Sequence, residues 1–167
     1  MGAGESVYVA RTPVTNAQYA EFLAATGYAA PQNWTDGTYP AGEDDFPVNY
    51  VSAADAEAYC AWLTERDGVN TYRLPNESEW ELAAGHMPKD ADFNYGVNDG
   101  RTSVEEYAKV TRGAHGAVDF WGNVWEWTTT VRSDSTLGVK GGAWDSARTD
   151  CRTEHRKEGR AASQGYK

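Results

Sequence analysis

The sequence predicts an α+β domain in which short helices and small antiparallel sheets are joined by long ordered loops. The chain of 167 residues is long enough to bury a sizeable core, and we expect a single domain over residues 1–167. Seven Trp and ten Tyr stand against four Phe, so the core carries polar groups that need internal hydrogen-bond partners. Seventeen Gly indicate much irregular structure.

Three short helices are predicted from their start and stop signals. Each begins with an N-cap residue that is followed three positions later by a side chain able to close a capping box. The pairs are Thr15 and Gln18, Ser52 and Asp55, and Asn76 and Glu79, and the helices end before Gly27, Gly68 and Gly85. In the third helix we expect Trp80, Leu82 and Ala83 to turn inward.

Short strands are expected at residues 6–10, 71–74 and 137–142. Residues 31–49 and 93–122 instead contain recurrent Gly, Asp, Asn and Pro with no sustained period. Loops of this length inside a compact domain are usually functional or held by a bound ion.

The net charge of −10 argues against nucleic acid as a partner, because phosphate recognition needs a basic footprint. The charge is unevenly distributed. Residues 132–167 hold eight Lys or Arg and five Asp or Glu, a net charge of +3, which leaves −13 for the rest. This C-terminal part either balances the acidic body or faces a different partner.

Two cysteines, Cys60 and Cys151, are too few for a disulfide scaffold, although one bridge between them is left open. No signal peptide and no apolar run approaching twenty residues is found, so we expect no membrane insertion. The sequence fixes neither the compartment nor the oligomeric state. A place in an assembly on a virion or a cell surface is one setting we consider.

Four motifs follow one another along the chain. They are PVTNAQY at 13–19, YRLPNESEWE at 72–81, GNVWEWT at 122–128 and GGAW at 141–144. In this order and at these separations they resemble the formylglycine-generating-enzyme/sulfatase-modifying domain. The resemblance extends from Tyr8 to the end of the chain, and it implies an irregular C-type-lectin-like fold.

Members of this family often carry calcium, and the resemblance places metal ligands at Asn123 and Glu126, with a second site at Asn94. Oxygen donors of this kind suit calcium. An acidic loop that helps to complete one family site is missing between Asn94 and Gly122. We therefore expect structural calcium as the one candidate metal and no required cofactor. The alternative is that Asn123 and Glu126 bond loop amides.

The catalytic members oxidise a substrate cysteine with two cysteines that bind copper. Alignment from Gly141 places these positions at Ser146 and Cys151. A hydroxyl does not replace a thiolate toward Cu(I), so half of that site is missing. A related iron-dependent branch places its metal ligands in another domain. From these observations we expect that the chain is not an enzyme; the alternative is a cysteine-oxidising enzyme with an incomplete copper site.

Another branch with this fold comprises the variable proteins of diversity-generating retroelements, whose changing residues follow a Gly-Gly-Ser-Trp motif. Here residues 145–157 follow the GGAW motif and contain no large apolar residue. Their backbone must be held by neighbours while their side chains face water. The residues expected to bind a ligand are Trp144, Asp145, Ser146, Ala147, Arg148, Asp150, Thr153, His155 and Lys157.

The leading hypothesis is therefore a ligand-binding display domain with a variable polar surface. Its partner is expected to be a protein or a cell-surface component. A structural domain of a phage particle or surface protein, without a ligand of its own, is a third possibility. The lectin-like fold alone does not imply carbohydrate binding, because function depends on the site rather than on the fold.

Overall fold

The structure is a computed structural model that describes residues 6–96, 98–133 and 136–161. Its elements are three α-helices, three strands and one 3-10 helix. In chain order they are α1 (Asn16–Thr26), α2 (Ala53–Asp67), α3 (Glu77–Ala84), β1 (Glu126–Ser133), β2 (Thr136–Lys140), η1 (Arg148–Cys151) and β3 (Lys157–Ala161). The predicted α+β class, with short helices, a small antiparallel sheet and long loops, is confirmed.

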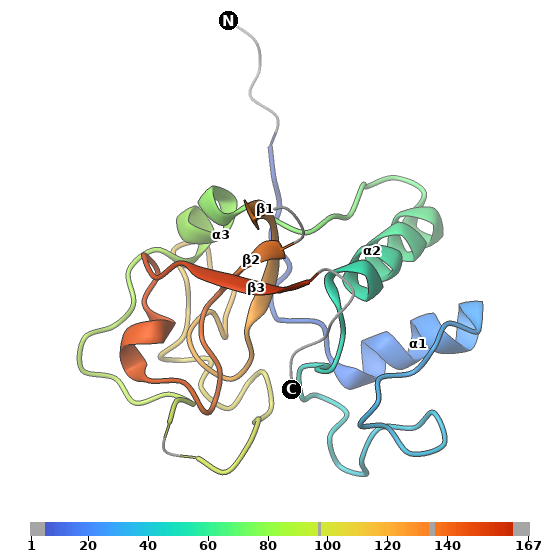
Figure 1. Cartoon of the computed structure of the whole chain (residues 1–167), viewed down its shortest axis with the longest axis horizontal. Helices are drawn as coiled ribbons and strands as arrows, with labels where there is room; N and C mark the ends of the chain where they lie inside the picture. The colour runs from blue at the N-terminus through green and yellow to red at the C-terminus, as the bar shows by residue number, and fades with distance from the viewer. Residues whose placement is uncertain (1–5, 97, 134–135, 162–167) are drawn as a thin grey trace, which may run out of the picture.

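The three strands form one antiparallel sheet in the order β1-β2-β3. Glu126 of β1 lies opposite Lys140 of β2, and Val139 of β2 lies opposite Lys157 of β3. In Figure 1 the sheet, α3 and η1 occupy one side of the molecule, and α1 and α2 lie together on the other. The long loops before β1 run beneath the sheet in this view. No helix in the described part is long and apolar enough to cross a bilayer.

The helix boundaries follow local chemistry, as predicted. All three capping boxes are present, and a glycine ends each helix. The inward position predicted for Leu82 is wrong, since its side chain is exposed while Trp80 and Ala83 are buried. Residues 6–10 and 71–74 do not join the sheet, and residues 6–10 are exposed.

Aromatic residues fill two of the three core clusters. Between α1 and α2, the rings of Tyr19 and Phe22 meet edge to face with their centroids 5.3 Å apart. A second cluster surrounds Trp80 beneath α3. The indole N–H of Trp127, in the third cluster, donates to the carbonyl of Val51 at 3.1 Å. This bond supplies the kind of internal partner that a Trp-rich core requires.

Three loops meet at Gly122 and Asn123. Gly122 has φ 78°, and a Cβ at this position would fall on the carbonyl oxygen of Asn94. The Gly122 amide donates to the carbonyl of Gly141, and the Asn123 amide donates to that of Asn94. The Trp144 amide in turn donates to the Asn123 carbonyl at 3.0 Å. This junction fixes where the C-terminal stretch begins.

The close packing at this junction predicts that two glycine substitutions differ greatly in their effect on the free energy of unfolding. Gly122→Ala adds a clash to the strain of a left-handed backbone, and should lower the free energy of unfolding by about 3 kcal/mol or more. Gly27→Ala is the matched control, because Gly27 has a similar φ of 69° but open space around its Cβ position. It should cost about 1 kcal/mol. Urea unfolding of both variants measures the difference; equal losses would contradict the close approach at Gly122.

Candidate functional site

The stretch from Trp144 to Lys157 is held from behind by long side chains. The Arg148 guanidinium donates to the carbonyls of Pro88, Lys89 and Ala91 at 2.7–3.0 Å. The same group lies 4.8 Å from the ring centroid of Phe93. A guanidinium is well suited to this position, because its planar fork satisfies several carbonyls while one face stacks on an aromatic ring. Arg148 therefore fixes η1 to the preceding loop.

A buried lysine holds the second half of the stretch. The ammonium group of Lys140, fully buried on β2, donates to Glu81 Oε1 at 2.9 Å and to the carbonyls of Thr153 and His155 at 2.6 and 2.7 Å. Burying an ammonium is costly unless it is paired and hydrogen-bonded. Here the three acceptors match the three N–H donors. The backbone around Thr153 and His155 is thereby fixed to the sheet and to α3.

Two smaller side chains also point inward. The Ser146 hydroxyl accepts from the Ala143 amide at 2.9 Å. The Thr153 hydroxyl donates to the Gly85 carbonyl at 2.6 Å and accepts from the indole of Trp121 at 3.0 Å. The prediction that side chains throughout this stretch face water is therefore wrong for Ser146, Arg148 and Thr153. Their hydrogen bonds hold the loop, which leaves them poorly placed to contact a ligand.

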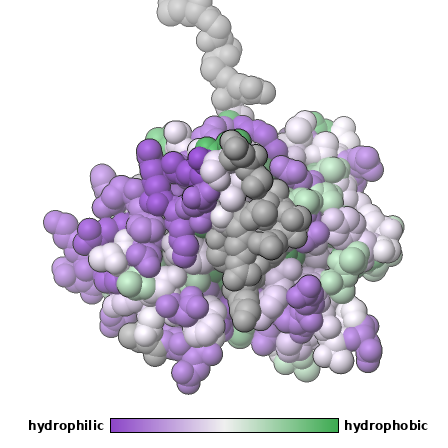
Figure 2. All heavy atoms as spheres, viewed as in Figure 1, coloured by the Kyte–Doolittle hydropathy of each residue, from purple (hydrophilic) through white to green (hydrophobic). Residues whose placement is uncertain are grey.

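The other predicted ligand-binding residues are exposed or half-buried. Asp145, Ala147 and Lys157 are exposed, and Trp144, Asp150 and His155 are half-buried. Figure 2 shows a largely hydrophilic surface on the side that carries η1 and the start of β3. The structure thus separates an inward set that holds the backbone from an outward set that is available for binding.

The sequence-based prediction missed Trp125. Its half-buried ring lies with its centroid 6.2 Å from that of His155, and Lys157 Nζ lies 4.4 Å from the Trp125 centroid. The Gly122-to-Trp127 motif carried no signal for this position, because alternation in an extended segment places Trp125 on the same face as Trp127. Trp127 is buried in the core, whereas Trp125 reaches the surface beside two predicted binding residues.

The predicted metal ligands Asn123 and Glu126 have different partners. Asn123 Oδ1 accepts from Asn94 Nδ2 at 3.1 Å and from the Thr102 amide at 2.9 Å, and its Nδ2 donates to Asp119 Oδ2 at 2.7 Å. Glu126 accepts from the Trp80 indole at 3.1 Å, and burial raises the pKa of Glu126 to about 8. In this arrangement the Asn123 side chain is engaged by protein groups through both its oxygen and its nitrogen. An ion would have to displace the bonds to Asn123, so calcium stays a prediction.

The described residues also do not fit the copper site of the catalytic relatives. Cys151 is fully buried, and burial raises the pKa of its thiol to about 12. The Ser146 oxygen is already committed to the Ala143 amide. Cys60 is a free, half-buried thiol on α2, and Cys151 is also free. Within the described ranges, no three His, Cys, Asp or Glu side chains come together as a metal site.

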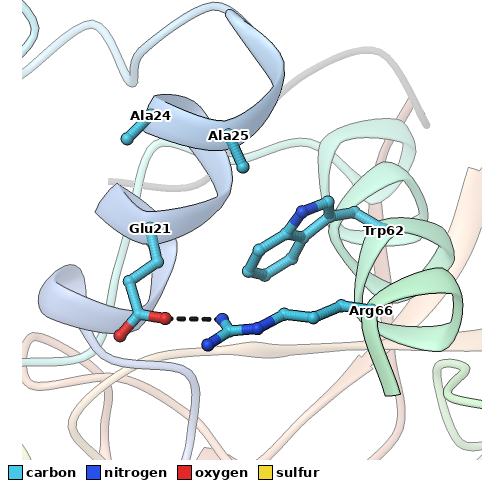
Figure 3. Close-up of a pocket in the computed structure, with 5 residues that line it drawn as sticks. All are labelled: Glu21, Ala24, Ala25, Trp62 and Arg66. Carbon is cyan, nitrogen blue, oxygen red and sulfur yellow. Dashed lines mark hydrogen bonds and ion pairs between the residues drawn. The ribbon is translucent and has the colours of Figure 1, made fainter. Parts of the chain in front are cut away.

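A separate hollow of about 520 Å³ lies between α1 and α2. Figure 3 shows Trp62 beside Arg66, which pairs with Glu21 across the hollow, beneath Ala24 and Ala25. The Arg66 guanidinium lies 5.1 Å from the Trp62 centroid. This hollow repeats the combination of an indole and a cation seen at Trp125, but here the cation has an acidic partner.

Comparison with protein families identifies the domain. A model of the sulfatase-modifying factor enzyme 1-like domain matches residues 4–166. The chain belongs to this family. It is 31% identical to the hercynine oxygenase of Mycolicibacterium smegmatis over 75% of its length, and 31% identical to the formylglycine-generating enzyme of Mycobacterium tuberculosis over 73%. The chain spans 37% of the first relative and 62% of the second.

The fold is also that of a solved variable protein. Treponema denticola variable protein 1 superposes with a TM-score of 0.68, covering 92% of this chain and 79% of that one, at 19% sequence identity. This likeness agrees with the predicted kind of scaffold.

The expectation that the chain is not an enzyme is corrected by these relatives. Both curated relatives are named as enzymes, one an oxygenase and the other a formylglycine-generating enzyme. The prediction relied on the missing copper ligand at Ser146. That residue argues only against copper-dependent oxidation of cysteine, and it does not exclude the other reactions that enzymes of the family catalyse.

The raised pKa of Glu126 predicts a pH-dependent stability. A neutral carboxyl is favoured in the fold, so its stabilising contribution is complete below about pH 4 and is lost as the pH rises toward 8. Glu126→Gln keeps an acceptor for Trp80 and does not ionise. The melting temperature of the wild type should fall relative to this variant by roughly 5 °C between pH 5 and pH 8.

Calcium provides the control for the same pair of proteins. If the ion binds at Asn123 and Glu126, millimolar calcium should stabilise the wild type at pH 8 and have little effect on Glu126→Gln. An equal response of both proteins excludes that site. Parallel melting curves of the two proteins between pH 5 and pH 8 would contradict the raised pKa.

Proposed function

We propose that this chain is the substrate-binding domain of an oxidising enzyme, and that its substrate is a small amino-acid derivative of the hercynine type. In this proposal the redox metal is held by another domain or polypeptide. The proposal is supported by the 31% identity to a hercynine oxygenase, a protein of which this chain spans 37%. The absence of a metal-ligating cluster among the described residues agrees with a metal held elsewhere.

The surface around Trp125 is the observation that carries the proposal. It combines an indole, an imidazole and an ammonium group on a backbone that Lys140 and Arg148 fix from behind. An oxidising enzyme must hold its substrate in one orientation, and a fixed binding surface lowers the entropic cost of doing so. Aromatic and cationic groups together recognise small amino-acid derivatives by stacking and by charge.

A cysteine-oxidising function of the formylglycine-generating type is less well supported. It requires a soft metal ligand at Ser146 and an accessible thiolate at Cys151. Ser146 supplies a hydroxyl that already holds Ala143, and the Cys151 thiol is buried with its pKa raised. Copper-dependent aldehyde formation on a cysteine peptide by the isolated domain would nonetheless replace the oxygenase proposal.

Titration with hercynine tests the proposed function. Hercynine should quench the fluorescence of the wild-type protein, and Trp125→Ala should weaken its binding at least about tenfold. Trp62→Ala is the matched control, because Trp62 is also half-buried beside a cation but lies between α1 and α2 (Figure 3). The affinity of Trp62→Ala for hercynine should equal that of the wild type. Melting curves establish that both variants fold, and failure of the wild type to bind hercynine rejects the proposal.

A ligand-display function is the second candidate, and one specific observation favours it. The outward side chains Asp145, Ala147, Asp150 and His155 lie on a backbone held by the inward set. Such side chains can be exchanged without loss of the hydrogen bonds that fix the loop. The variable positions in this candidate exclude Ser146, because its hydroxyl is part of that fixed frame.

Simultaneous exchange of the outward side chains tests the display candidate. A variant with Asp145→Tyr, Ala147→Ser, Asp150→Asn and His155→Tyr should melt within a few degrees of the wild type, because the inward hydrogen bonds are kept. Ser146→Val is the contrasting single change and should destabilise the domain by about 1–3 kcal/mol, since it strands the Ala143 amide. A fourfold variant that fails to fold would contradict the candidate.

A further inference from the structure

We propose that the surface around Trp125 binds a carboxylate, and that Lys157 is the residue that selects for it. The inference rests on the proposed function and names the chemical class that its substrate must carry. It begins from three nitrogen-bearing side chains, those of Trp125, His155 and Lys157, which gather at one place on the surface.

These side chains have donors and charge without matching acceptors. Among the residues that the structure describes, no carboxylate lies within ion-pair distance of Lys157. Neither the Trp125 indole N–H nor the His155 ring forms a hydrogen bond within the same described ranges. An ammonium is among the most strongly hydrated groups in a protein and pairs well with a carboxylate oxygen. A ligand with acceptor oxygens would meet all three groups.

Four other cations of the C-terminal part already have partners, which distinguishes Lys157 from them. Lys140 and Arg148 hold the backbone, as described above. Arg132 pairs with Glu77, and Arg156 lies 3.6 Å from Glu81. The charge of these four residues is therefore committed to the structure, whereas Arg152 and Lys157 have no ion-pair partner among the described residues.

The nearest acidic neighbour along β3 is directed elsewhere. Successive residues of a strand point to opposite faces, so Glu158 is turned away from Lys157. Its carboxylate accepts from the hydroxyls of Ser133 and Thr136, which lowers the pKa of Glu158. Glu154 is exposed and carries the one other acidic side chain between Cys151 and β3. A ligand carboxylate at Lys157 consequently has to compete with little negative charge from the protein.

The indole–cation pair of α2 provides a comparison, because its cation has an acidic partner. Arg66 also lies over an indole, that of Trp62, but its guanidinium is paired with Glu21 (Figure 3). The corresponding acid is missing at Lys157 among the described residues. We infer that the ligand supplies it.

Matched pairs of acids and amides test the inference. The probes are two acids and their amides: hercynine, which carries a carboxylate, a quaternary ammonium group and an imidazole, hercynine amide, indole-3-acetate and indole-3-acetamide. Lys157→Gln should weaken binding of at least one acid about tenfold and leave its amide unweakened. Lys157→Arg should restore most of the affinity, and Arg66→Gln should change nothing. Because Lys157 is exposed, melting temperatures should stay within about 2 °C.

The outcomes separate this inference from the proposed function. Lys157-dependent binding of indole-3-acetate without any binding of hercynine supports the carboxylate site and rejects the hercynine-type substrate. Hercynine binding that is equally strong in Lys157→Gln supports the proposed function and overturns the role of Lys157. If acids and amides bind alike, or if no acid binds, the carboxylate site is rejected.

Discussion

The hydrogen bonds of one buried side chain, that of Asn123, hold the loop region of this domain together. Its amide group bonds to Asn94, Thr102 and Asp119, and its backbone bonds to Asn94 and Trp144. Asn123 has φ 64°, a conformation that asparagine tolerates better than most residues. Three loops without regular structure thus share one fixed point, and the C-terminal stretch starts from it. The positions of the surface groups depend on this junction.

Hydrogen bonds also explain how an exposed loop can be rigid. The stretch after Trp144 has little apolar side-chain area to bury, so hydrophobic packing contributes little to its order. Lys140 and Arg148 replace that packing with charge-assisted hydrogen bonds to backbone carbonyls. Such bonds are stronger than neutral ones, and those of Lys140 are shielded from water because its side chain is fully buried. The outer side chains are then free of structural duties, which both candidate functions require.

Local chemistry made the helices predictable from the sequence, whereas distant contacts hid the site. Capping boxes and terminal glycines depend on residues three or four positions apart, and all three were found. Leu82 was misplaced because a helix of eight residues defines its buried face weakly. The partners of Arg148 are carbonyls 57 to 60 residues away, and no pattern of side chains records such bonds. Trp125 lies in the GNVWEWT motif, but alternation places it on the same face as the buried Trp127 and so does not mark it as a surface residue.

Ser146 removes a ligand that a copper site needs, and its hydrogen bonds order the loop that ligand binding needs. A thiolate ligand must keep its lone pairs for the metal, and sulfur accepts hydrogen bonds weakly. The Ser146 oxygen accepts from the Ala143 amide, while the Ser146 amide donates to the Ala143 carbonyl at 2.9 Å. The turn is therefore closed on both sides. The Ser146 oxygen is thus unavailable to copper and instead constrains the backbone of this turn. A fixed backbone favours recognition of a ligand at the surface over metal chemistry at this position.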